Sequence, residues 1–300
     1  LVSVDCSDKL TFIGDNAFFN CTLLVSIGDL GSVTTIEYYA FAGCSSLERL
    51  EHLDNLVSLG EGVFGYGSHY TGCISLKSIG DMPKLESMGQ KCFVSCTTLE
   101  TVGDLSSLKE IPYEAFDGCT SLVSIGDLNN VESIANEAFS NCSALEHVDK
   151  LDKITSIGQN AFKGCTALKS IGSLHNLETI GQGAFSGCSA LEHVDDLYSL
   201  TRLEYDVFSH CVSLISVDCS DKLTAIGSSA FFGCKALVSI GDLSNVTSIE
   251  SSVFRGCIAL KSIGNMPKLE SIGMQCFMGC TALETVGDLS SLKEIPYEAF

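Results

Sequence analysis

The sequence predicts a solenoid of parallel β-strands joined by short turns, and two observations carry that prediction. A unit of 23 residues repeats along the chain, with Leu at its first position, aliphatic residues at the fourth, tenth and thirteenth, Phe at the eighteenth and Cys at the twenty-first. Apolar residues recur at every third position within a unit, which matches neither the period of a helix nor that of a strand. Stacked units of short segments and corners match it, and they bury a continuous core. The first position is occupied by Leu1, Leu24, Leu47, Leu76, Leu99, Leu122, Leu145, Leu168, Leu191, Leu214, Leu237, Leu260 and Leu283.

The elements of one unit follow from its spacing. In the unit that begins at Leu24, we expect a short parallel strand over 24–27 and a second extended segment near Ile36. A tight helical or 3₁₀ turn is expected to carry Ala40 and Phe41. Each of about 13 repeats would add one rung at the spacing of neighbouring strands, roughly 4.8 Å. The Phe residues of successive rungs then form a ladder in the core.

The unbroken repeat predicts a single solenoid domain over 1–300. The chain begins at Leu1 without a Met and stops at Phe300 in the middle of a unit, so we expect a fragment of a longer array. One insertion of six residues falls within 65–72, between Phe64 and Cys73. Residues 99–116 are identical to residues 283–300, which indicates recent duplication of units.

Composition and charge exclude several classes of function. Hydrophobic residues make up 45% of the chain and charged residues only 18%, which favours a folded core. The net charge of −20 would repel nucleic acid and anionic membranes. No apolar stretch reaches the roughly 18 residues needed to cross a bilayer. We therefore expect neither nucleic-acid binding nor membrane insertion in this part of the chain.

The repeated phrases SIGDLGSVTTIEYYAFAGCSSL and TSIGQNAFKGCTALKSIGSL, with Ile-Gly, Ala-Phe and Gly-Cys in fixed register, resemble the BspA-type leucine-rich repeats, also called the leucine-rich repeat 5 family. The resemblance covers all the units and implies a leucine-rich-repeat solenoid. It also implies a surface or secreted protein that adheres to host proteins or to other cells. The family's strand usually continues as Ile-x-Ile-Pro, whereas here it reads Ile-Gly-Asp-Leu, so we expect the strand to end at the Gly.

Sixteen cysteines raise the question of disulfides and metals. The twelve at the twenty-first position would lie about one rung apart, where they either pack as free thiols, which we favour, or form disulfides between rungs. Cys92 and Cys276 replace Ala or Val, which also favours packing. Cys6 and Cys219 stand among polar neighbours at the sixth position and are expected to be more exposed and reactive. Zinc is not expected, because neither CxxC pairs nor nearby His residues are present.

Asp occupies the sixth position of many units, three of them consecutive at Asp81, Asp104 and Asp127. Each carboxylate could accept a backbone N–H in its own turn, or the stacked carboxylates could bind calcium. We favour the turn, because other units carry Lys150 or Ser173 there without a compensating ligand.

Two groups of residues are candidates for contact or modification. The insertion carries Tyr66, His69 and Tyr70, residue types that are common in recognition loops, although surface loops also tolerate insertions that have no function. Three Asn-x-Ser/Thr sites, at Asn20, Asn141 and Asn245, are candidates for N-glycosylation. Asn20 and Asn141 stand where most units have Gly, which suggests a left-handed turn, so Asn245 is favoured.

No nucleophile elbow, phosphate loop or metal motif is present, so no enzyme activity and no cofactor are expected. His147 and His193 are interpreted as ordinary surface residues. The sequence predicts a non-enzymatic adhesion or protein-binding scaffold at the cell surface or outside the cell, with a protein or glycan ligand. The alternative is a structural protein whose copies assemble end to end into extracellular filaments or a surface coat.

Overall fold

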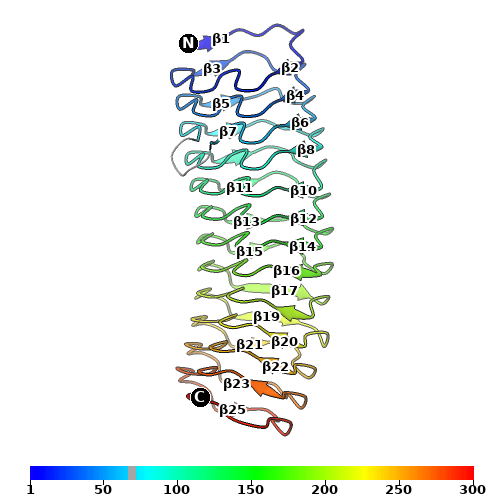
Figure 1. Cartoon of the computed structure of the whole chain (residues 1–300), viewed down its shortest axis with the longest axis vertical. Helices are drawn as coiled ribbons and strands as arrows, with labels where there is room; N and C mark the ends of the chain where they lie inside the picture. The colour runs from blue at the N-terminus through cyan, green and yellow to red at the C-terminus, as the bar shows by residue number, and fades with distance from the viewer. Residues whose placement is uncertain (67–71) are drawn as a thin grey trace. The chain divides into compact units, whose positions relative to one another are not determined.

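The computed structural model describes residues 1–66 and 72–300. Two compact units, 1–153 and 154–300, make up the chain, and the prediction of one domain over 1–300 stays a prediction. Each unit is a stack of coils, and a coil is one repeat whose positions are numbered from its first leucine. Within each unit the odd-numbered strands form one series and the even-numbered strands another (Figure 1). The predicted solenoid of parallel strands is confirmed.

In the first unit, the odd-numbered strands begin at coil position 3: β1 (Ser3–Val4), β3 (Ser26–Ile27), β5 (Arg49–Leu50), β7 (Ser78–Ile79), β9 (Thr101–Val102), β11 (Ser124–Ile125) and β13 (His147–Val148). The even-numbered strands begin at coil position 12: β2 (Phe12–Ile13), β4 (Thr35–Ile36), β6 (Ser58–Leu59), β8 (Ser87–Met88), β10 (Glu110–Ile111) and β12 (Ser133–Ile134). Paired residues are one repeat apart, as in Ser3 with Ser26. The insertion leaves this register intact, because Arg49 pairs with Ser78.

In the second unit, the odd-numbered strands are β15 (Ser170–Ile171), β17 (His193–Leu197), β19 (Ser216–Cys219), β21 (Ser239–Ile240), β23 (Ser262–Ile263) and β25 (Thr285–Val286). The even-numbered strands are β14 (Ser156–Ile157), β16 (Thr179–Ile180), β18 (Arg202–Leu203), β20 (Ala225–Ile226), β22 (Ser248–Ile249) and β24 (Ser271–Ile272). The strands β17, β19 and β21 pair in that order, as do β18, β20, β22 and β24.

Most odd-numbered strands end at coil position 4, one residue before a Gly, as the sequence predicts. In several coils, a side chain at this Gly would collide with the coil before it. At Gly126, for example, an added Cβ would lie well inside van der Waals contact with the carbonyl oxygen of Gly103. The longer strands β17 and β19 belong to consecutive coils that both carry Asp at this position, Asp195 and Asp218, so their backbones can pair further.

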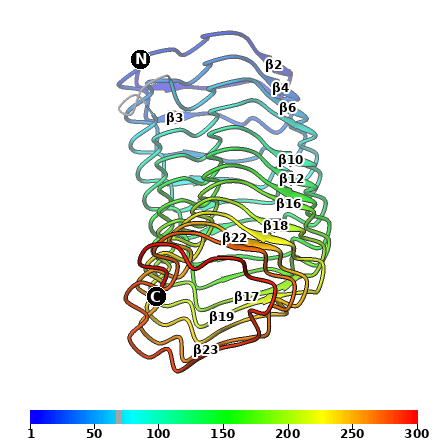
Figure 2. The same cartoon turned by 60° about the horizontal axis from the view of Figure 1, so that its bottom comes forward.

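The third side of each coil is a series of turns, which corrects the expectation of a helical or 3₁₀ turn at Ala40 and Phe41. Successive backbone amides of the turn form hydrogen bonds alternately to the next coil and within their own coil. The amide of Phe41 donates to the carbonyl of Val63 in the next coil, whereas the amide of Ala42 donates within its own coil to Tyr39. A 3₁₀ helix would direct every amide back into its own turn. Figure 2 shows the resulting loops, coil above coil, within the first unit.

Residues at coil positions 16 and 20 hold this turn in place with a left-handed backbone. At position 20, Asn20 and Asn141 have φ of 56° and 60°, which confirms the interpretation of these residues as left-handed. Position 16 is left-handed as well, although Gly is rare there. Its residues are Asn16, Tyr39, Gly62, Lys91, Glu114, Glu137, Asn160, Gly183, Asp206, Ser229, Ser252, Gln275 and Glu298.

The Phe ladder is the centre of each unit's core. In the first unit, neighbouring rings from Phe18 to Phe139 are nearly parallel, with centroids 4.9 to 5.8 Å apart. In the second unit, the spacing from Phe162 to Phe300 is 5.3 to 5.6 Å. Among residues 1–66 and 72–300, no helix is long and apolar enough to span a bilayer.

The position-21 cysteines pack beside this ladder, and most of them are fully buried, which confirms the packing interpretation. The expectation of an exposed Cys219 is wrong: its exposed fraction is 4%. Strand β19 continues through Asp218 to Cys219, so the alternation of side chains turns Val217 and Cys219 inward and Asp218 outward. Cys6, at the same coil position in the first coil, is partly exposed.

Candidate functional site

The outer face of the odd-numbered strands, formed by coil positions 3, 5 and 6, is the broadest candidate surface in each unit; we call it the odd-strand face. Ser or Thr occupies position 3 in most coils, with Arg49, His147 and His193 as the exceptions, and carboxylates gather at positions 5 and 6. His147 and His193 lie exposed on it, as expected. The Nδ1 atom of His193 is 2.8 Å from the hydroxyl of Ser216 in the next coil.

Three shallow hollows lie on the odd-strand face and use the same coil positions. One, of about 520 Å³, is lined by Ser26, Arg49 and His52 among others. A second, of about 420 Å³, lies over β11 and β13 and includes Ser124 and His147. The third, of about 270 Å³, lies in the second unit over β17, β19 and β21. The repeat therefore makes a similar recess in several coils, with different side chains at its rim.

The Asp residues at position 6 stabilise the turn that follows the strand. The Oδ1 atom of Asp127 accepts the amide of Asn129 at 2.9 Å, and that of Asp242 accepts the amide of Ser244 at 2.7 Å. These bonds confirm the turn interpretation, and the same contact is made by Asp29, Asp104 and Asp288. In Asp81, the carboxylate instead accepts the amide of Asp104 in the next coil.

A charge pair closes one end of the second hollow. The Nζ atom of Lys150 lies 2.6 Å from Oδ2 of Asp127. This hydrogen bond lowers the pKa of the Asp127 carboxyl, and the bond to the Asn129 amide lowers it further. Both carboxylate oxygens thus have protein partners. Within the described part of the chain, no three His, Cys, Asp or Glu residues are arranged to hold a metal ion.

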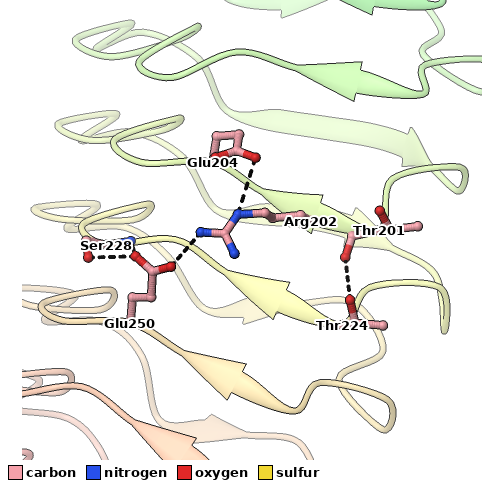
Figure 3. Close-up of polar contacts among 6 residues, drawn as sticks. All are labelled: Thr201, Arg202, Glu204, Thr224, Ser228 and Glu250. Carbon is pink, nitrogen blue, oxygen red and sulfur yellow. Dashed lines mark hydrogen bonds and ion pairs between the residues drawn. The ribbon is translucent and has the colours of Figure 1, made fainter.

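The even-numbered strands of the second unit carry an ion-pair network (Figure 3). Arg202 bonds Glu204 in its own coil through Nε at 3.2 Å and reaches Glu250 two coils away through Nη2. Between them, Ala225 occupies the position of Arg202 in the middle coil, and its small side chain leaves the path open. Glu250 also accepts the amide and hydroxyl of Ser228. The network links three coils, and its charged groups form hydrogen bonds and ion pairs with one another.

Of the predicted contact residues, Tyr66 is described, and His69 and Tyr70 lie outside the described residues. Tyr66 is exposed and contacts two other aromatic rings. Its ring centroid lies 5.6 Å from that of Phe19 and 5.3 Å from that of Tyr39, each at an interplanar angle of 82°. The three residues, which we call the aromatic cluster, come from three consecutive coils.

The aromatic cluster was not predicted as a whole, because Phe19 and Tyr39 have no role in the repeat pattern. They stand at coil positions 19 and 16, and Tyr66 lies in the insertion, so no column of the repeat contains more than one of them. Tyr39 is the available signal, because the other units carry small, charged or amide side chains at its coil position.

The three glycosylation candidates differ in how their side-chain amides are used. The Nδ2 atom of Asn245 donates to the carbonyl of Asp221 at 2.7 Å, and its Oδ1 accepts Lys268. The amide of Asn141 donates to Asp117 and Ser140. Asn20 is exposed at a left-handed corner. A glycan on Asn245 or Asn141 would replace hydrogen bonds that the fold makes.

Comparison with known proteins identifies the class. The family model for the BspA type leucine rich repeat region matches residues 1–122, 86–215 and 196–300, so the chain belongs to this family. It is similar to the crystal structure of a leucine-rich repeat protein from Bacteroides ovatus, with 29% identity and a TM-score of 0.70 over 95% of this chain and 78% of the other.

Two further solved structures share the fold. A leucine rich cell surface protein from Faecalibacterium prausnitzii is 24% identical, with a TM-score of 0.51 over 96% of this chain and 87% of the other. The pneumococcal vaccine antigen PcpA is 20% identical, with a TM-score of 0.52 over 99% and 78%. No curated protein matches the chain.

Proposed function

We propose that this protein is a non-enzymatic scaffold at the cell surface or outside the cell, and that it adheres to a protein or glycan partner through the odd-strand face. The single observation that supports it most is the repetition of one shallow recess at the same coil positions. Repeat proteins present extended surfaces of this kind, where many weak contacts add up along the stack. Membership of the BspA-type family agrees with such a role.

The chemistry of the face favours recognition over catalysis. The carboxylates of the turns accept backbone amides, so they act as structural acceptors. The buried thiols are poor nucleophiles, because burial raises the pKa of Cys96 and Cys211 to about 12. A partner would instead meet the His, Ser and Arg side chains that differ from coil to coil.

A binding experiment with matched variants tests the proposal. The chain would be immobilised and exposed to purified extracellular-matrix proteins and to intact epithelial cells. Ser124→Arg and Ser216→Arg place a long side chain in two of the hollows. Ser133→Arg and Ser248→Arg place the same side chain at the partly exposed first residue of even-numbered strands.

We expect the first pair of variants to reduce retention at least about tenfold, and the second pair to bind like the native chain. Equal loss in both pairs would contradict the odd-strand face as the binding surface. Light scattering over a concentration series separates the alternative function. Filaments that grow with concentration, in a chain that retains neither matrix proteins nor cells, would replace adhesion with self-assembly.

A further inference from the structure

We infer that the aromatic cluster of Phe19, Tyr39 and Tyr66 is a binding site for a neutral glycan. The inference goes beyond the proposed scaffold role, because it places a ligand of defined chemistry at a site away from the odd-strand face. The first observation is the exposure of the rings. The exposed fractions of Phe19 and Tyr66 are 36% and 48%. They stay exposed although the rings of Phe19 and Tyr39 both contact the ring of Tyr66.

The second observation is the backbone of Tyr39, whose φ is 56°. A left-handed backbone is unfavourable for a bulky side chain. The other coils carry Asn, Gly, Lys, Glu, Asp, Ser or Gln at this coil position, so an aromatic residue there is a departure from the repeat. The left-handed backbone is common to all the coils, so the distinguishing feature of this corner is the aromatic side chain that it carries.

The next coil accommodates this departure. Gly62 occupies the same coil position as Tyr39, and a Cβ at Gly62 would collide with Cε1 of the Tyr39 ring. The Tyr39 amide donates to the carbonyl of Glu61 at 3.0 Å, and its hydroxyl donates to Oε1 of Glu61 at 3.1 Å. Glu61 therefore holds both the backbone amide and the hydroxyl of Tyr39, and Gly62 leaves room for its ring. The Tyr39 ring in turn contacts the ring of Tyr66.

The arrangement matches the two-sided chemistry of a pyranose ring. One face of such a sugar is a patch of C–H groups that packs against an aromatic ring, and its hydroxyls point outward and need hydrogen-bond partners. Phe19 and Tyr66 offer exposed ring surface, and Tyr side chains pair an apolar ring with a polar tip. The partly exposed Glu61 carboxylate at the edge of the cluster has acceptor capacity beyond the single bond from Tyr39.

Charge selects the kind of glycan. Glu61 is part of the site, and Asp15 is nearby in the stack, where it accepts the amide of Tyr38 at 3.2 Å. The chain as a whole carries a net charge of −20. Sialylated or sulfated sugars would be repelled, so a neutral glycan is favoured. An open set of rings also differs from the enclosed, desolvated pockets that anchor protein partners.

The test begins with an array of neutral oligosaccharides built from glucose, galactose, mannose, fucose and N-acetylglucosamine, each printed beside its sialylated or sulfated counterpart where one exists. Hits are titrated by tyrosine fluorescence, which is readable because the chain has eight Tyr and no Trp. We expect at least one neutral glycan to bind, more tightly than its anionic counterpart.

Variants then locate the site. Tyr66→Ala and Phe19→Ala should each weaken binding about tenfold, which corresponds to about 1.4 kcal/mol. Tyr66→Phe keeps the ring and should bind within about threefold of the native chain. Tyr205→Ala is the matched control, because Tyr205 is equally exposed, at 48%, and lies in the second unit. Thermal melting of each variant identifies any loss that is due to unfolding, and Tyr66→Phe retains the cluster if Tyr66→Ala does not fold.

Several outcomes would overturn the inference. They are the absence of any neutral hit, unchanged binding in both Tyr66→Ala and Phe19→Ala, equal loss in Tyr205→Ala, or tighter binding of anionic glycans. A captured glycoprotein that still binds after enzymatic removal of its glycans would indicate protein recognition instead. Glycan binding lost in Ser124→Arg but kept in Tyr66→Ala would overturn the aromatic site and still support the odd-strand face.

Discussion

The thiol of Cys119 donates to the backbone carbonyl of Phe93 in the preceding coil, across 3.1 Å. The same carbonyl accepts the amide of Cys96 in its own coil. The Phe93 carbonyl therefore binds one amide within its coil and one thiol from the next. Cys142 makes the equivalent contact with Phe116, as does Cys234 with Phe208 in the second unit. The cysteine column thus adds a hydrogen bond between coils inside the core.

This contact predicts different results for two substitutions of one residue. Cys119→Ala removes the donor and leaves a small void, so the free energy of unfolding should fall by about 1–2 kcal/mol. Cys119→Ser keeps a donor at nearly the same place and should cost less. Denaturant unfolding of both variants measures the difference. An equal loss in the two variants would show that the thiol serves only to fill space.

A second prediction concerns the reactivity of the thiols. Burial raises the pKa of Cys219 and Cys211 to about 12, so roughly one such thiol in ten thousand is ionised at pH 8. Cys6 is partly exposed and should react first with a thiol reagent. Labelling of the native protein at pH 8, followed by peptide mass spectrometry, gives the order. Cys219 labelled as fast as Cys6 would contradict the buried position of Cys219.

Glycines at the same coil position should respond oppositely to a methyl group. A Cβ at Gly126 would collide with the Gly103 carbonyl, whereas a Cβ at Gly264 would meet nothing within 4 Å. We expect Gly126→Ala to lower the melting temperature markedly, with a loss of more than about 2 kcal/mol. Gly264→Ala should be neutral or stabilising by up to about 1 kcal/mol. Thermal unfolding of both variants is the measurement, and similar melting temperatures would contradict the close approach at Gly126.

The Arg202 network predicts a contribution that depends on pH and salt. The hydrogen bond from Arg202 lowers the pKa of Glu250, so the pair stabilises the fold above the ordinary Glu value of 4.5 and loses this contribution as the pH falls below it. Both side chains are about 40% exposed, so solvent screening limits the coupling to about 0.5–1 kcal/mol.

A double-mutant cycle with Arg202→Gln and Glu250→Gln measures that coupling free energy. We expect a value that declines with added salt and falls as the pH drops below 4.5. Coupling that responds to neither salt nor acid would mean that packing, and not charge, connects the two side chains. The exposed Arg49 offers a control, because it belongs to the other unit and makes no ion pair with Glu250, so Arg49→Gln combined with Glu250→Gln should give simple additivity.

The features that sequence reasoning predicted all depend on spacing along one coil. The Phe ladder, the buried cysteines and the turn bonds of residues such as Asp242 each follow from a fixed place in the repeat. Cys219 was misjudged because its polar neighbours suggest exposure, whereas one further strand residue reverses the direction of its side chain. The prediction therefore failed where backbone pairing, and not residue type, decides whether a side chain is buried.

The left-handed residues at position 16 could not be predicted for a related reason. Lys91 and Glu114 have no preference for positive φ, and they adopt it because their amides must reach the next coil. The aromatic cluster has a similar origin, since Phe19, Tyr39 and Tyr66 meet only after three coils are stacked. Its rings come from three different positions, so no periodic signal marks them.

The direction of the hydrogen bonds between coils has an electrostatic consequence. On the strand sides the later coil donates, as from Val25 to Val2, whereas on the turn side the earlier coil donates, as from Phe18 to Ala40. Each peptide group carries a dipole of about 3.5 D. Since the two sets point oppositely along the stack, they largely cancel, and lengthening a unit by further coils builds up little dipole at either end. A long α-helix cannot avoid that accumulation, so in each unit the ionised side chains set the electric field that an approaching ligand encounters.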